Sequence, residues 1–72
     1  MNHIAICGTI VTKAGAHNFL KRVCKNLFAD HLTLEASFVM TEIERRLIEA
    51  NFLTPIEIEA IEIEALKERE EA

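Results

Sequence analysis

The chain has 72 residues, of which 50% are hydrophobic, and it carries a net charge of −4 and only two cysteines. Its length leaves room for one domain with a marginal core, because a chain of this size buries only about 60% of the surface that it exposes when unfolded. No apolar run reaches the roughly 18 residues of a membrane span, and no basic segment precedes an apolar one at the start, so we expect a soluble, cytoplasmic protein with a single domain over residues 1–72.

The first predicted element is a β-strand over residues 3–12, followed by a turn that ends at residue 15. Its β-branched side chains alternate between two apolar faces, formed by Ile4, Ile6 and Ile10 and by Ala5, Cys7 and Val11. We expect both faces to be buried, and Gly8 to mark a bulge or a close approach of another backbone. If the rest of the chain is helical, this strand must pair with its counterpart in a second subunit, so Ile4, Ile6 and Ile10 are candidates for self-association.

The second predicted element is a basic amphipathic helix over residues 16–31. Apolar side chains recur at helical spacing along one stripe, formed by Phe19, Leu20, Val23, Cys24, Leu27 and Phe28. Lys21, Arg22 and Lys25 fall on the opposite face, where they could contact the phosphates of a nucleic acid. Cys7 and Cys24 both occupy positions that the patterns predict as buried, so we expect small buried hydrophobes rather than a disulfide.

Residues 32–51 are predicted to form the next helix, although residues 32–40 leave two interpretations open. Strand-like alternation is seen in Leu32, Leu34, Ala36, Phe38 and Met40, and helical spacing in Ala36, Met40, Ile43, Leu47 and Ala50. We favour the helix. In the strand alternative, residues 32–40 would pair with the first strand, and the helix would begin at Thr41 with a capping box that includes Glu44.

The last predicted helix, at residues 54–69, is acidic and has two apolar faces. Asn51 can end the preceding helix in the left-handed conformation, and Thr54, Pro55 and Glu57 supply a cap, a first-turn proline and a capping-box glutamate. On a helical wheel the apolar residues form two nearly opposite stripes, Ile56, Ala60 and Ile63, and Ile58, Ile61 and Ala65.

A helix with two apolar stripes can bury one against its own domain and needs a further surface to cover the other. We therefore predict that Ile58, Ile61 and Ala65 contact a second copy of the chain. The alternative is that a three-helix core covers both stripes within one subunit.

The junction of the last two helices carries a family resemblance. Residues 43–58, IERRLIEANFLTPIEI, are similar to SHOCT domains, whose pattern is a leucine-bearing helix, a glycine, an apolar residue, a threonine, and then acidic and aromatic residues. The resemblance extends over residues 43–66, about a third of the chain, and it implies a C-terminal helical hairpin that mediates oligomerisation. Asn51 stands where glycine is usual, and Ile56 and Ile58 replace an acidic and an aromatic residue. Residues 1–40 resemble no family.

The sequence offers little for catalysis or metal binding. His17, Cys24 and His31 would share a helix face, but seven residues rise about 10.5 Å along a helix, too far for ligands of one zinc ion. His3 and Cys7 would lie about 13 Å apart on a strand. No nucleophile stands beside a base and no glycine-rich loop could hold phosphate, so we expect no enzyme, no cofactor and no metal.

The charge distribution is asymmetric. Residues 1–31 contain four cations and Asp30, which gives +3, whereas residues 32–72 contain four cations and eleven glutamates, which gives −7. Such a chain could pair head to tail or expose an acidic arm.

We therefore predict a mainly α fold with one N-terminal strand, β-α-α-α, in a homodimer. The predicted function is that of a non-enzymatic interaction module, in a small bacterial or phage accessory regulator. Two alternatives remain. One is a nucleic-acid-binding regulator with the outline of ribbon-helix-helix proteins, which would use the basic helix face. The other is an inhibitor that docks the acidic residues 67–72 on a basic enzyme.

Overall fold

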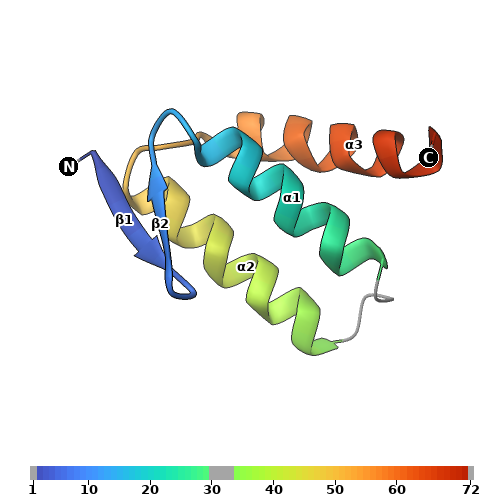
Figure 1. The fold of residues 1–72 in the computed structure, drawn as a ribbon, viewed down its shortest axis with the longest axis horizontal. Coiled ribbons are helices and arrows are strands. Elements are labelled where there is room, and N and C mark those ends of the chain that lie inside the picture. The colour runs from blue at the N-terminus through green and yellow to red at the C-terminus, as the bar shows by residue number, and fades with distance from the viewer. Residues whose placement is uncertain (1, 30–33, 72) are drawn as a thin grey trace.

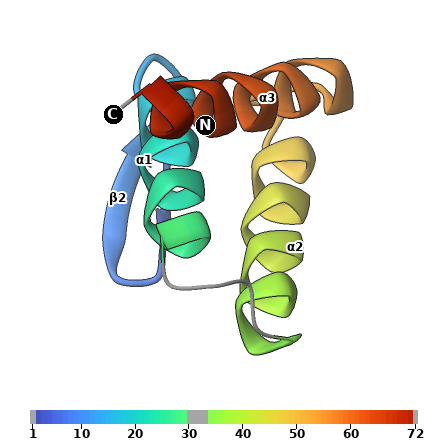
Figure 2. The same cartoon turned by 90° about the vertical axis from the view of Figure 1, so that its right-hand side faces the viewer.

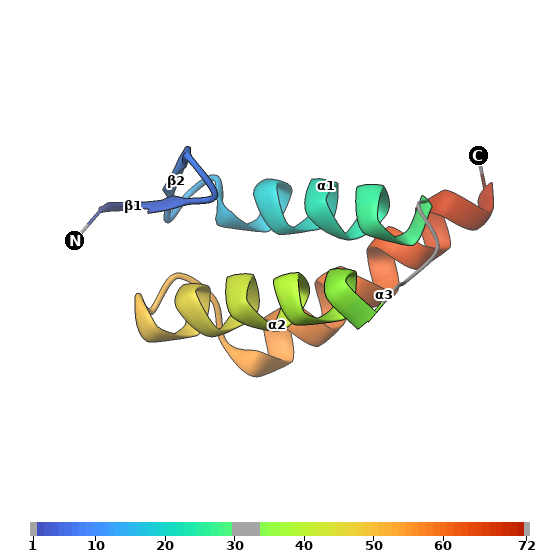
Figure 3. The same ribbon diagram turned by 90° about the horizontal axis from the view of Figure 1, so that it is seen from below.

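The computed structural model describes residues 2–29 and 34–71, in which an N-terminal β-hairpin precedes three helices (Figure 1). The elements in chain order are β1 (His3–Ile6), β2 (Thr9–Thr12), α1 (Ala16–Ala29), α2 (Leu34–Glu49) and α3 (Pro55–Glu71). Helices α1 and α2 run side by side, the hairpin lies at one end of this pair, and α3 crosses one side of it (Figures 2 and 3). The predicted mainly helical class with N-terminal β structure is confirmed.

The prediction of one continuous strand over residues 3–12 is wrong, because the chain reverses within it. Strands β1 and β2 pair antiparallel, with His3 opposite Thr12 and Ile6 opposite Thr9. At the turn, Cys7 and Gly8 have φ angles of 51° and 77°, and a type I′ turn requires positive values at both of these positions. Gly8 is therefore a turn residue rather than a bulge.

This hairpin changes which residues share a face. Residues opposite one another in an antiparallel ladder lie on the same face, so Ile6 lies with Ile4 and Val11, whereas Ile10 lies on the other face. Ile6 and Val11 are buried in the core, and Ile10 is 65% exposed. The predicted common face of Ile4, Ile6 and Ile10 is wrong, as is the prediction that both faces are buried. Because β1 has its partner within the chain, the reason for expecting an intersubunit ribbon is removed.

The turn at residues 13–15 and the amphipathic helix after it are confirmed. The backbone N–H of Gly15 donates to Oγ1 of Thr12 at 3.0 Å, and α1 begins at the next residue. Leu20 and Cys24 are fully buried. Partly buried neighbours complete this face of α1, namely Phe19, Val23 and Leu27.

The helical interpretation of residues 32–40 is confirmed from Leu34 onward, and residues 32 and 33 lie outside the described part of the chain. Thr41 lies inside α2, where its hydroxyl donates to the carbonyl oxygen of Ser37 at 3.0 Å, instead of capping a helix. Met40, Ile43 and Leu47 point into the core at helical spacing.

The connection between α2 and α3 follows the predicted local chemistry. Asn51 has a φ of 60°, and the N–H of Phe52 donates to the carbonyl of Leu47 at 3.0 Å, which is the long hydrogen bond of a Schellman motif. Thr54 Oγ1 accepts the N–H of Glu57 at 3.2 Å, and Glu57 Oε1 accepts the N–H of Thr54 at 3.0 Å. Both halves of the predicted capping box are present. Beyond it, α3 packs mainly against α1.

Candidate protein-interaction site

Helix α3 buries one of its two apolar stripes and exposes the other. Ile58, Ile61 and Ala65 lie in the core, with exposed fractions of 5%, 1% and 0%. Ile56 and Ile63 on the opposite side are 80% and 61% exposed. The sequence-based assignment of the stripes is therefore reversed, because the predicted self-association residues pack inside their own subunit. They do so on a helix that packs mainly against α1.

We call the exposed side of α3 the α3 stripe and define it as Ile56, Ala60, Ile63 and Leu66. Leu66 is 46% exposed and lies at the edge of the stripe. Exposed glutamates flank it, including Glu57 and Glu59. An apolar stripe of this kind on a helix surface is typical of a protein-interaction site.

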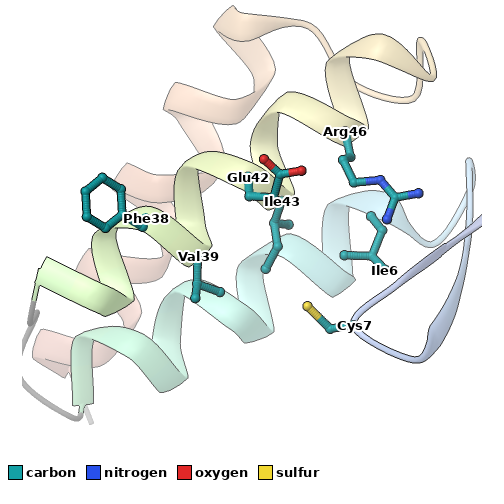
Figure 4. Close-up of a pocket in the computed structure, with 7 residues that line it drawn as sticks. All are labelled: Ile6, Cys7, Phe38, Val39, Glu42, Ile43 and Arg46. Atoms are coloured by element: carbon teal, nitrogen blue, oxygen red, sulfur yellow. The ribbon is translucent and has the colours of Figure 1, made fainter.

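A second apolar feature is a groove between the tip of the hairpin and α2, with a volume of about 290 Å³ (Figure 4). Phe38 lies at one end of it and Arg46 at the other, with Val39 and Ile43 between them. Its remaining lining residues are Ile6, Cys7 and Glu42. Phe38 is 66% exposed, so α2 presents a large aromatic side chain to solvent beside this groove.

The groove was not predicted from the sequence. Phe38 and Val39 lie in a segment for which the sequence allowed either a helix or a strand. No sequence signal indicated that they would lie next to Cys7. Cys7 was predicted to be buried and is exposed at the turn, whereas Cys24 is buried as predicted, and both are free thiols.

The basic face of α1 is largely occupied by glutamates of α3. Lys21 Nζ lies 2.8 Å from Oε2 of Glu68 and 3.2 Å from Oε1 of Glu64. Lys25 Nζ lies 3.1 Å from Oε1 of Glu68. Hydrogen bonds to Glu68 and then Glu64 raise the pKa of Lys21. These ion pairs join the acidic helix α3 to the basic face of α1.

Of the three residues considered for nucleic-acid contact, Lys21 and Lys25 therefore have carboxylate partners within the chain. Arg22 is exposed and has no ion pair among the described residues; it borders a shallow hollow with Ile10 and Phe19. Glu68 of the acidic C-terminal arm is likewise engaged by both lysines. The charges on which both alternative functions depend are thus partly neutralised inside the subunit.

A carboxyl pair lies where the three helices meet. Burial is the main cause that raises the pKa of Glu44 on α2 to about 8, and a hydrogen bond with Glu62 on α3 and the like charge of that group add to it. Oε2 of Glu44 is buried without a hydrogen-bond partner among the described residues. Burial, together with the charges of Glu62 and Glu44, also raises the pKa of the Cys24 thiol to about 12. This thiol stays protonated near neutral pH and is a poor nucleophile.

Two further observations concern residues 2–29 and 34–71. No three His, Cys, Asp or Glu side chains gather there in an arrangement that could hold a metal ion. None of the helices described is both long enough and apolar enough to cross a membrane.

Comparisons with known proteins return no similar protein. No protein-family model matches the chain, and neither the curated proteins nor the solved structures contain a significant match.

Proposed function

We propose that this chain is a non-enzymatic protein-interaction module that associates with further copies of itself through the α3 stripe. The observation that carries the proposal is the exposure of Ile56 and Ile63, at 80% and 61%, on a helix whose opposite side already fills the core. The other apolar side of α3 has no cover within the described residues. Association would remove it from water.

The expected affinity is modest. Covering Ile56, Ile63 and Leu66 of one copy, together with the apolar surface that they contact on the next copy, contributes on the order of 5 to 10 kcal/mol. Association costs about 4 to 15 kcal/mol in lost translational and rotational freedom. We therefore expect a dissociation constant on the order of 100 µM, and a dimer as the smallest assembly.

The test compares two isoleucine-to-lysine variants by light scattering at high protein concentration. Ile63→Lys places a charge in the middle of the α3 stripe and should yield a monomer. Ile48→Lys makes the same change on the exposed side of α2, where Ile48 is 37% exposed, and should associate as the wild type does. If both variants behave alike, the α3 stripe is not the contact and the proposal fails.

A further inference from the structure

Homotypic contact between two α3 stripes is electrostatically unfavourable. Glu57 and Glu59 are exposed beside the stripe, and Lys67 is the exposed cation nearest to it along the described helix. Two such surfaces face to face carry two of these glutamates for each Lys67, so some glutamates of the two copies face each other, and like charges at close range oppose association. A surface without this acidic excess is a better partner for the α3 stripe.

The groove between the hairpin tip and α2 provides apolar surface of the required kind. Ile6 and Ile43 are buried at its base, at 1% and 3% exposure, while Phe38 and Val39 stand exposed along α2. Its volume of about 290 Å³ falls at the lower limit of sites for small-molecule ligands, which start near 300 Å³. It is large enough for isoleucine and leucine side chains from a helix.

The charges around the groove complement an acidic helix. Arg45 is held by Glu42 and Glu49, so the carboxylate of Glu42, which lines the groove, is already compensated. Arg46 lines the groove too; the hydrogen bond from Arg45 is the main cause that lowers the pKa of Glu42, and the charge of Arg46 contributes to it. Among the described residues, however, Glu42 and Glu49 form their salt bridges with Arg45 and not with Arg46. The guanidinium of Arg46 is thus available to a carboxylate that arrives with a partner helix.

We infer that the α3 stripe of one copy docks in the groove between the hairpin tip and α2 of the next copy, with a flanking glutamate of α3 paired to Arg46. This inference rests on the proposed self-association and names its mode. The groove contains no residue of α3, so the two surfaces of one copy are separate. The contact is heterologous, and assemblies can grow beyond a dimer.

The test uses two variants that each retain one of the two surfaces. The groove variant, Val39→Lys with Arg46→Glu, keeps its α3 stripe, and the stripe variant, Ile63→Lys, keeps its groove. Each alone should be monomeric by light scattering at about 1 mM, roughly ten times the expected dissociation constant. Mixed in equal amounts, they should form a complex of two chains and nothing larger, because only one contact can form.

A matched control is Arg22→Glu, which reverses an exposed arginine outside the groove and should associate as the wild type does. Circular dichroism of each variant establishes that the helices are intact, and recovery of binding in the mixture shows that both surfaces are correctly formed.

Three outcomes would overturn the inference. If the groove variant alone associates as well as the wild type, the α3 stripes contact each other, and only the proposed function survives. If the mixture remains monomeric while the wild type associates, the groove is not the receiving surface. A wild type that is monomeric at every concentration removes both the inference and the proposed function.

Discussion

Glu44 is the residue whose environment departs most from that of a surface carboxyl. It lies at the meeting point of the three helices, where burial and the neighbouring Glu62 raise its pKa from 4.5 to about 8. A carboxyl of this kind is largely protonated at neutral pH, so it can donate to Glu62 instead of repelling it. The protonated state therefore avoids the repulsion that two carboxylates would produce between α2 and α3.

The raised pKa makes the stability of the fold depend on pH. Between pH 4.5 and about 8 the folded chain binds more protons at Glu44 than the unfolded chain does, so the free energy of unfolding falls as pH rises. Its contribution is fully present below pH 4.5 and is lost as pH passes through about 8. Because the pair is partly open to solvent, we expect a loss of about 1 to 2 kcal/mol in urea unfolding between pH 5 and pH 8.

The variant Glu44→Gln distinguishes the pH dependence caused by Glu44 from that caused by other titratable groups. Glutamine mimics the protonated carboxyl, so the variant should be more stable than the wild type at pH 8 and should lose most of the decline between pH 5 and pH 8. Glu59→Gln, on the exposed side of α3, is the matched control and should retain the decline. Equal pH profiles for the wild type and Glu44→Gln would show that Glu44 is not the group responsible.

A substitution at Gly8 tests whether the hairpin turn requires a positive φ angle at this residue. Its φ is +77°, and a Cβ placed there would meet no atom within 4 Å, so Gly8→Ala changes the backbone energy without a steric clash. We expect it to lower the free energy of unfolding by about 1 to 2 kcal/mol. Cys7→Asn, which places a residue favoured in type I′ turns beside it, should raise stability instead. If Gly8→Ala leaves the free energy of unfolding unchanged, the positive φ angle assigned to this turn residue is contradicted.

Among the elements, α3 shows what the sequence could and could not predict. Its start was predictable because Thr54, Pro55 and Glu57 act through contacts within one turn. The choice between its two stripes was not, because Ile56, Ala60 and Ile63 are as apolar as Ile58, Ile61 and Ala65. That choice depends on the fit to α1, which lies far away in the sequence.

The start of α3 can be tested by Thr54→Ala, which removes the oxygen that accepts the N–H of Glu57. We expect a loss of about 0.5 to 2 kcal/mol in the free energy of unfolding, measured by urea titration. Thr54→Ser keeps that oxygen and should remain close to the wild type. A loss of the same size in both variants would mean that the hydroxyl is not what stabilises this end.

The hairpin was missed for a related reason. The turn residues Cys7 and Gly8 lack the Asn-Gly or Asp-Gly signal of a two-residue hairpin, and β-branched residues continue on both sides of them. The alternation of side chains alone therefore predicted one continuous strand over residues 3–12. The prediction that Ile4, Ile6 and Ile10 contact a second subunit depended on there being one unpaired strand, and it lost its basis once the chain was seen to form a hairpin.

At the scale of the whole molecule, the apolar surface is larger than three short helices and a hairpin can cover. The sequence indicated an excess, since half of its residues are hydrophobic in a chain of 72. It could not indicate the place of the groove, because Cys7 and Val39 meet only after the hairpin and α2 have packed. The α3 stripe and the groove together account for Ile56, Ile63, Leu66, Phe38 and Val39, five of the exposed large hydrophobic residues.

The most direct test of self-association is the molar mass of the wild-type chain, measured by light scattering at neutral pH from about 10 µM to 1 mM, a range that brackets the expected dissociation constant. We expect the mass to rise with concentration above the 8.2 kDa of one chain. A mass that stays at 8.2 kDa over the whole range would contradict the proposed function.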